Sequence, residues 1–148
     1  MPATKRSRHD ARKGSVMRML LILAGLGQLG LALGSLAIPR TLGWIEDTNK
    51  LRPLTRQVFW TYAAYIWATN VGFGLLSTFA PELLLNRSAL ARVVAGYITA
   101  YWGARVLVQF FFFDRSEAPA EALYKVAEAT LVTLFVFLTA VYGYVVVS

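Results

Sequence analysis

The sequence contains no cysteine and only one histidine, His9. Without thiols, the chain cannot form disulfides, carry out thiol redox chemistry or hold a metal through thiolates. This excludes the four-helix membrane oxidoreductases that form disulfides. His9 lies beside Asp10 in a basic N-terminal segment, so we expect an exposed side chain and not a metal ligand. The sequence therefore predicts no metal site and no other cofactor.

Charged residues are also scarce. They make up 16% of the sequence, and hydrophobic residues make up 57%, against about 25% and about 45–50% in soluble domains. This composition favours lipid as the solvent. In a soluble protein, a basic N-terminal segment would suggest nucleic acid. Next to an apolar run, we expect it to lie against anionic lipid headgroups and predict no nucleic-acid partner. Its basic residues are Lys5, Arg6, Arg8, Arg12, Lys13 and Arg18.

Long apolar runs are what the sequence has in abundance. About 20 helical residues cross a hydrocarbon core of about 30 Å, and only helices or closed barrels satisfy their backbone in lipid. The runs are too long for barrel strands. We therefore predict an all-α protein: a transmembrane four-helix bundle over residues 16–148, preceded by a disordered basic tail over residues 1–15. The predicted spans are 16–38, 58–80, 89–113 and 123–147, with Ser88 and Ser116 as N-caps of the last two helices.

The first run has a second interpretation, as a cleaved signal peptide. It follows a basic segment, and Ser35-Leu36-Ala37 has the small-x-small pattern of a cleavage site. However, the apolar centres of signal peptides are usually about 7–15 residues long, and Pro39 follows the candidate site directly. We favour an uncleaved first helix.

The basic residues also predict the orientation in the membrane. With the N-terminus inside, the cytoplasmic segments hold eight Lys and Arg residues and the opposite side holds six. The positive-inside rule then places the N-terminus in the cytoplasm. Four spans return the C-terminus to the same side. Tyr142 and Tyr144 are expected to anchor the inner interface, because tyrosine is enriched there.

Small residues recur at helical spacing along the predicted helices, including the third, where they are Gly96, Ala100 and Gly103. Small residues allow helix backbones to approach closely in lipid, where packing drives association. We expect these faces to pack inside the bundle; the alternative is an interface between two copies of the chain. The residues of the first two helices are Gly27, Gly30 and Gly34 in the first and Ala64, Ala68 and Gly72 in the second.

Arg105 lies well inside the third run, where a charge costs about 2.5–3.5 kcal/mol on insertion scales. Gln109 is one turn away, and Glu128 lies at the same expected depth of roughly 12 Å across the following turn. We predict an ion pair between Arg105 and Glu128 that Gln109 shares. Gln28 and Asn70, near the centres of their helices, are expected to complete a polar layer. This cluster either fastens the helices together or forms a ligand site.

Several segments resemble a group of uncharacterised small four-span bacterial membrane proteins that are loosely similar to the DoxX type. The similar segments are residues 59–62, 70–74, 101–105 and 109–114, under half of the chain. The resemblance implies a four-helix fold in a bacterial inner membrane. It implies no function.

These observations predict a non-enzymatic accessory or scaffold subunit in the membrane. Its partners would be the lipid bilayer and either further copies of itself or a larger membrane complex. The alternative is a protein, with or without enzymatic activity, that binds a lipid, a quinone or another amphiphile at a site centred on Arg105. A weaker alternative is a transporter formed by oligomerisation, because four helices enclose little space.

Overall fold

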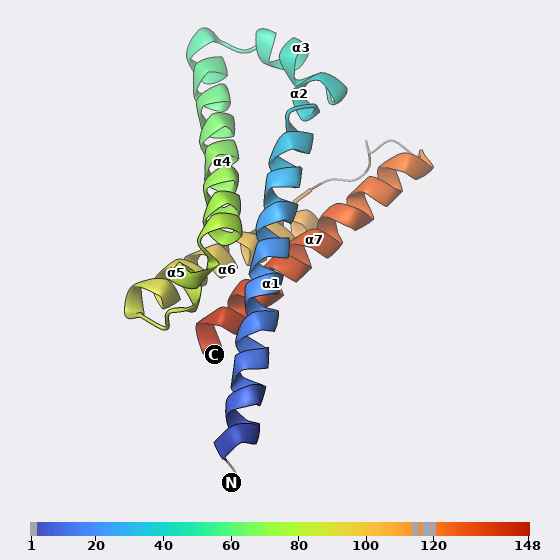
Figure 1. The fold of residues 1–148 in the computed structure, drawn as a ribbon. Coiled ribbons are helices and arrows are strands. Elements are labelled where there is room, and N and C mark those ends of the chain that lie inside the picture. The colour runs from blue at the N-terminus through green and yellow to red at the C-terminus, as the bar shows by residue number, and fades with distance from the viewer. Residues whose placement is uncertain (1–2, 114–115, 117–120) are drawn as a thin grey trace.

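The computed structural model describes the backbone of residues 3–113, 116 and 121–148. All regular structure in this part of the chain is helical, as predicted. Most of each apolar run lies in a long helix (Figure 1), although the first long helix ends before the end of the first run and the third long helix before the end of the third. The four long helices are α1 (Ala3–Ser35), α4 (Pro53–Phe79), α6 (Ala89–Phe111) and α7 (Ala122–Val147). Three short helices connect them: α2 (Ile38–Thr41), α3 (Trp44–Asn49) and α5 (Pro81–Leu85).

Local sequence signals explain where several helices begin. Pro53 and Pro81 occupy the first turns of α4 and α5, where the missing N–H of proline costs no intrahelical bond. The Ser88 side chain accepts a hydrogen bond from the backbone N–H of Ala91 and caps α6 as predicted. The prediction of Ser116 as the cap of the last helix was wrong, because α7 begins at Ala122 with Glu121 in the N-cap position.

The predicted disordered tail was also wrong for most of its length. Residues 3–15 form the first turns of α1, which continues without a break into the apolar run. No proline occurs between Ala3 and Ser35, and seven of the thirteen residues 3–15 are Ala, Arg or Lys, which have high helix propensity. Once the apolar run is helical, adding further turns requires no new nucleation.

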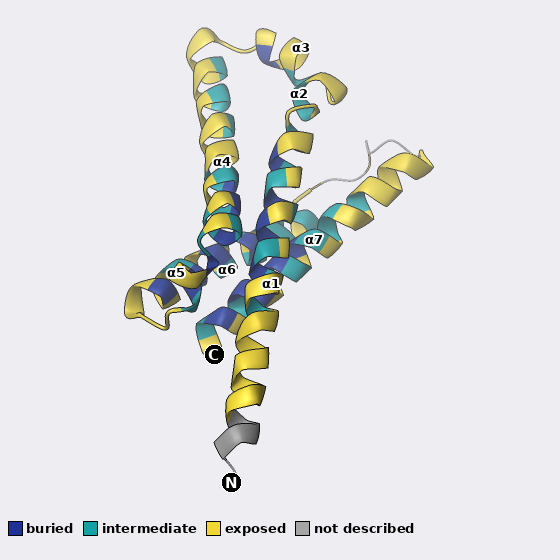
Figure 2. Cartoon of the chain, viewed as in Figure 1, coloured by how far each residue is buried: buried dark blue, intermediate teal, exposed yellow. Residues whose placement is uncertain are grey.

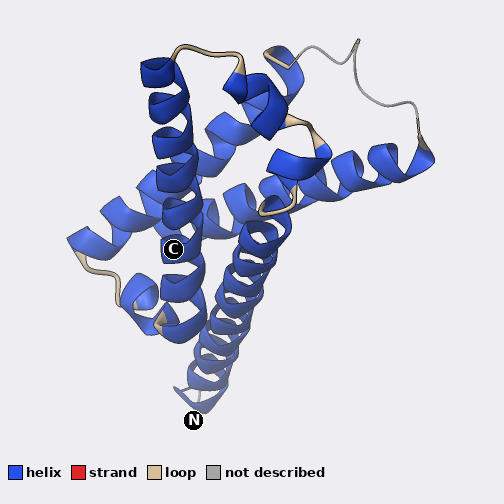
Figure 3. Cartoon of the chain, turned by 90° about the horizontal axis from the view of Figure 1, so that it is seen from above, coloured by secondary structure: helices blue, strands red, loops and turns tan. Residues whose placement is uncertain are grey.

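The long helices are arranged as two pairs. α1 packs along α4, and α6 packs along α7. Figures 1 and 3 show α7 crossing α1 obliquely, so the pairs do not run side by side as in an up-and-down bundle. Burial is concentrated around this crossing (Figure 2). The core there includes Leu21 and Ala24 of α1, Ile98 and Trp102 of α6, and Phe135, Leu138 and Tyr142 of α7.

α1 and α4 approach closely at Gly25 and Gly74. A Cβ atom on Gly25 would lie 2.8 Å from the carbonyl oxygen of Gly74, and one on Gly74 would lie 2.9 Å from the side chain of Leu29. These distances are shorter than real Cβ contacts allow. Glycine at both positions is therefore what permits the two backbones to approach.

Two segments, 7–35 and 122–147, are long and apolar enough to cross a membrane. Only 28% of the most apolar window of each is buried inside the protein. The remaining residues of these windows are partly or fully exposed.

Candidate functional site

The centre of the crossing holds a hydrogen-bond network with one side chain from each long helix. Gln28 of α1, Ser77 of α4, Trp102 of α6 and Tyr142 of α7 are all fully buried. The Gln28 amide nitrogen donates to the Tyr142 hydroxyl at 2.5 Å, and the hydroxyls of Ser77 and Tyr142 are also 2.5 Å apart. The Trp102 indole N–H donates to the Gln28 carbonyl oxygen at 3.2 Å. We call these four residues the central network.

The chemistry of the partners fixes the orientation of the Gln28 amide. An indole N–H can only donate, so the group facing Trp102 must be the carbonyl oxygen of Gln28. Its NH2 group then faces Tyr142 and also donates to the backbone carbonyl of Ala24 at 3.3 Å. Both ends of the amide are satisfied, which removes the main cost of burying it.

An aromatic cluster surrounds the network. The Trp102 ring stacks on Phe135 of α7, with centroids 5.3 Å apart, and meets the edge of Tyr101 at 5.2 Å. Tyr101 in turn contacts Phe73 of α4 at 5.5 Å. These rings fill the space between α4, α6 and α7. Tyr101 and Trp102, which flank Arg105 in sequence, therefore belong to a packed interior.

Arg105 and Glu128 do not form the predicted pair. The ion pairs among the described residues are Arg18–Glu82 and Lys50–Asp47. The Arg105 guanidinium instead lies over the Phe135 ring, 5.5 Å from its centroid. The Gln109 amide donates to the Glu128 carboxylate at 3.2 Å. α6 and α7 thus bring these residues to one region. The Glu128 carboxylate accepts a hydrogen bond from Gln109 there and forms no ion pair with Arg105.

Asn70 is buried, as its central position suggested, but it does not join Gln28. Its side-chain oxygen accepts a hydrogen bond from the Tyr101 hydroxyl at 2.9 Å. The predicted polar layer is therefore divided into three parts: the central network, the Asn70–Tyr101 bond, and the group of Arg105, Gln109 and Glu128.

Most of the predicted packing residues of α1 and α4 face outward. Gly30, Gly34 and Gly72 have no atom within 4 Å of the place where a Cβ would stand, and Ala64 and Ala68 are exposed. Gly27 is the exception, because its Cβ would lie 3.0 Å from Leu134 of α7. The prediction that these residues pack against other helices of the same chain was therefore wrong for all of them except Gly27.

The sequence analysis missed three members of the central network. Tyr142 was expected at the membrane interface, yet it is fully buried, whereas Tyr144 is half exposed. Ser77 and Trp102 were not proposed as partners of Gln28. The sequence of α1 did contain a signal for this face. Leu21, Ala24, Gly25, Gln28 and Ala32 recur at helical spacing, and all five are buried in the structure.

Two charged contacts join exposed side chains outside the central network. The pKa of the Glu82 carboxyl is lowered because its own backbone N–H donates to it and because Arg18 donates to it at 2.6 Å. The pKa of Lys50 is raised by its hydrogen bond to Asp47, at 2.9 Å. All four side chains are mostly exposed, so these contacts contribute little to stability.

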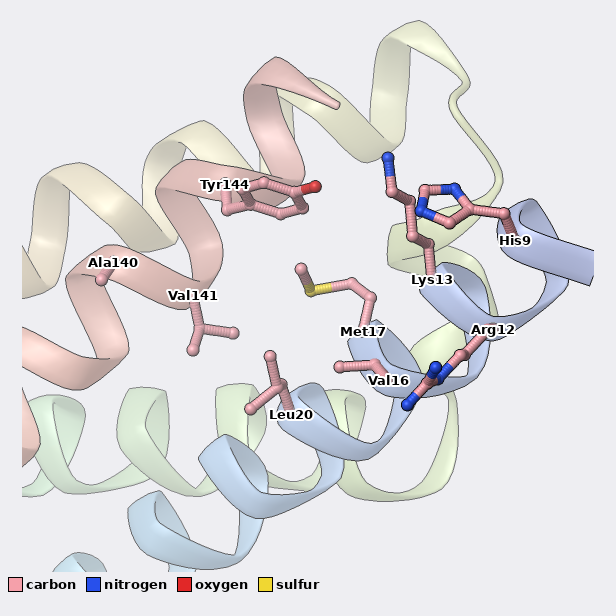
Figure 4. A pocket seen from close by; sticks show the side chains of 9 residues that line it. All are labelled: His9, Arg12, Lys13, Val16, Met17, Leu20, Ala140, Val141 and Tyr144. Atoms are coloured by element: carbon pink, nitrogen blue, oxygen red, sulfur yellow. The ribbon is translucent and has the colours of Figure 1, made fainter. Parts of the chain in front are cut away.

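Hollows on the described surface include one between α1 and α7 and one along α4. A cleft of about 540 Å³ separates the N-terminal part of α1 from the C-terminal part of α7 (Figure 4). A second hollow, of about 500 Å³, lies along α4 beside Ala64 and Ala68. Arg105 lines neither of them. The described residues contain no group of three His, Cys, Asp or Glu side chains placed to hold a metal ion.

Comparison with protein-family models, curated proteins and solved structures gives no match for this chain. Its function must therefore be argued from its own residues.

Proposed function

We propose that this chain is a four-span protein of a bacterial inner membrane, similar in architecture to the DoxX type, that acts as a non-enzymatic accessory or scaffold subunit. α1, α4, α6 and α7 would be the spans, with both termini in the cytoplasm. The observation that carries the proposal is the distribution of side chains: Gln28, Ser77, Trp102 and Tyr142 bond to one another inside, while large apolar side chains are exposed on the outside.

The exposed apolar side chains support membrane insertion of α4 and α6 as well as α1 and α7. On α4, Tyr65 is 67% exposed and Phe79 is 76% exposed; on α6, Val93 is 68% exposed. In water such surfaces would drive aggregation, whereas in lipid they face hydrocarbon. Gln28, Asn70 and Ser77 are buried instead, which is the arrangement expected when the solvent is apolar.

The central network supports an uncleaved first helix. α1 contributes Gln28 to the network and Leu21 and Ala24 to the core. Removing residues 1–37 would leave Trp102 and Tyr142 without their amide partner, so cleavage would leave unsatisfied groups at the centre of the fold.

The exposed small residues support a role in association. Ala64 and Ala68 border the hollow on α4, and Gly30 and Gly34 leave the surface of α1 open. A helix from another chain could approach closely at such a face. The alternative, a ligand site centred on Arg105, is less favoured, because Arg105 packs on Phe135 and lines neither hollow.

Topology can be tested by cysteine labelling because the parent has no cysteine. With a membrane-impermeant maleimide on intact cells, Glu46→Cys should react at once. Ser148→Cys should react only after permeabilisation. Labelling of both positions from the same side would contradict four spans, and release of the chain by alkaline carbonate would contradict membrane insertion.

Association can be tested by native electrophoresis of membranes solubilised in mild detergent. The parent should migrate as an oligomer or a larger complex, and Ala64→Leu with Ala68→Leu should shift it to the monomer. The matched control is Ala104→Leu with Ala129→Leu, which adds the same bulk at exposed alanines of α6 and α7. A parent that is monomeric in lipid nanodiscs and in membranes would overturn the accessory role.

A further inference from the structure

We propose that the cleft between α1 and α7 binds a single anionic phospholipid of the cytoplasmic leaflet. This inference rests on the proposed membrane location and adds a binding site to it. The site is separate from Arg105 and from the central network.

The cleft has one basic end and one apolar end. His9, Arg12 and Lys13 lie at the end near the N-terminus of α1. Toward the centre of the protein, Met17 and Leu20 of α1 face Val141 of α7 across the cleft (Figure 4). None of the lining residues is acidic. A ligand that satisfies both ends must carry a negative charge next to an apolar body.

The cleft has the size of a ligand site. Its volume of about 540 Å³ falls within the roughly 300–1,000 Å³ typical of small-molecule sites. From His9 to Leu20 it follows α1 over roughly 16 Å, at 1.5 Å per residue. A free phosphate ion would occupy only the basic end and would leave the apolar floor uncovered.

The polarity of the cleft runs in the same direction as that of a phospholipid. With the N-terminus in the cytoplasm, the basic end lies at the inner surface and the apolar end points toward the hydrocarbon core. The Tyr144 hydroxyl points toward the basic end, opposite Lys13 (Figure 4). A headgroup phosphate would lie among Arg12, Lys13 and Tyr144, and an acyl chain would lie along Met17, Leu20 and Val141. Basic pockets between helices on the cytoplasmic side are known to suit anionic headgroups.

The test uses the full chain, purified in a nonionic detergent and mixed with phosphatidylglycerol or phosphatidylcholine of the same acyl length. Native mass spectrometry counts the lipids bound. The parent should bind one phosphatidylglycerol in preference to phosphatidylcholine. Arg12→Gln with Lys13→Gln should weaken phosphatidylglycerol binding by about thirtyfold, the combined effect of two basic residues near an anionic surface.

The matched control is Arg87→Gln with Arg92→Gln. It removes two positive charges from the same predicted side of the membrane but outside the cleft, and it should stay within about threefold of the parent. If both double variants lose binding equally, general surface charge explains the preference and the cleft proposal is overturned. The same conclusion follows if Arg12→Gln with Lys13→Gln binds like the parent.

A third variant tests the apolar end. Ala140→Trp should fill the cleft and reduce binding of both lipids without changing the charge. Circular dichroism melting confirms that each variant is folded. Inorganic phosphate at millimolar concentration should not displace the lipid; displacement would show an anion site and overturn the lipid proposal. A chain that stays soluble without detergent would instead refute the membrane location itself.

Discussion

Gln28 and Tyr142 are 114 residues apart in the sequence, yet the Gln28 amide donates to the Tyr142 hydroxyl at 2.5 Å in the interior. This bond joins the first long helix to the last. Because Ser77 and Trp102 bond to the same two side chains, the bond also ties the α1–α4 pair to the α6–α7 pair.

Tyr142→Phe should therefore lower the melting temperature in detergent. The ring remains, but Gln28 and Ser77 each lose a partner, and a buried polar group left unsatisfied costs about 1–3 kcal/mol. The control is Tyr62→Phe, which removes a hydroxyl from an exposed ring of α4 outside the central network and outside the cleft, and it should leave the melting temperature unchanged. Equal melting of the two variants would mean that the central network does not stabilise the fold.

The positions of the helices could be predicted from the sequence, but their partners could not. The length of the apolar run, together with Pro53 and Pro81, is enough to locate α4 and the start of α5 from local sequence. Which side chains meet depends on the crossing of the two pairs, which no local pattern specifies. Tyr142, near the end of its helix, has the sequence context of an interface anchor. The oblique path of α7 brings it to the centre instead.

The same limitation applied to the glycines. Spacing marked Gly30 and Gly34 as a packing motif, whereas the close approach occurs at Gly25 and Gly74. Spacing shows which small residues share a face, but not whether another helix covers that face. Burial of Gln28 was predictable, because an amide near the centre of an apolar helix needs an internal partner.

Gly25→Leu should destabilise the chain strongly, since its Cβ would meet the backbone of α4 at Gly74. In the monomer, Gly30→Leu with Gly34→Leu should melt like the parent, because no atom beyond the neighbouring turns of α1 lies within 4 Å of the added Cβ positions. Thermal melting in detergent measures both. A large loss in the second variant, together with no loss in the first, would mean that the α1–α4 contact has a different register.

The Arg105 contact can be measured with two double-mutant cycles. Arg105→Met with Phe135→Leu should reveal a coupling of about 0.5–2 kcal/mol, the range of cation–π contacts from exposed to desolvated sites. Arg105→Met with Glu128→Gln should show a smaller coupling, because the carboxylate is bonded by Gln109. A coupling of about 3 kcal/mol in the second cycle would indicate a buried ion pair between Arg105 and Glu128 and would contradict the observed geometry.

Glu82 makes a pH-dependent contribution with a definite sign, through the hydrogen bonds that its carboxylate accepts from its own backbone N–H and from Arg18. The pKa of Glu82 in the folded chain lies below its ordinary value of 4.5. The stabilisation is therefore complete above that value and is lost as the pH falls through the folded pKa. Below about pH 5, the melting temperature of the parent should fall more steeply with decreasing pH than that of Glu82→Gln, because glutamine cannot titrate.

The difference should be small and should shrink in high salt, because both side chains are more than half exposed and exposed pairs are screened. Glu46→Gln removes an exposed carboxylate from α3 and controls for net charge. It should retain the steeper slope of the parent. If Glu82→Gln shows that same slope, the acid sensitivity of the chain arises elsewhere, and the Arg18–Glu82 contact does not hold α5 against α1.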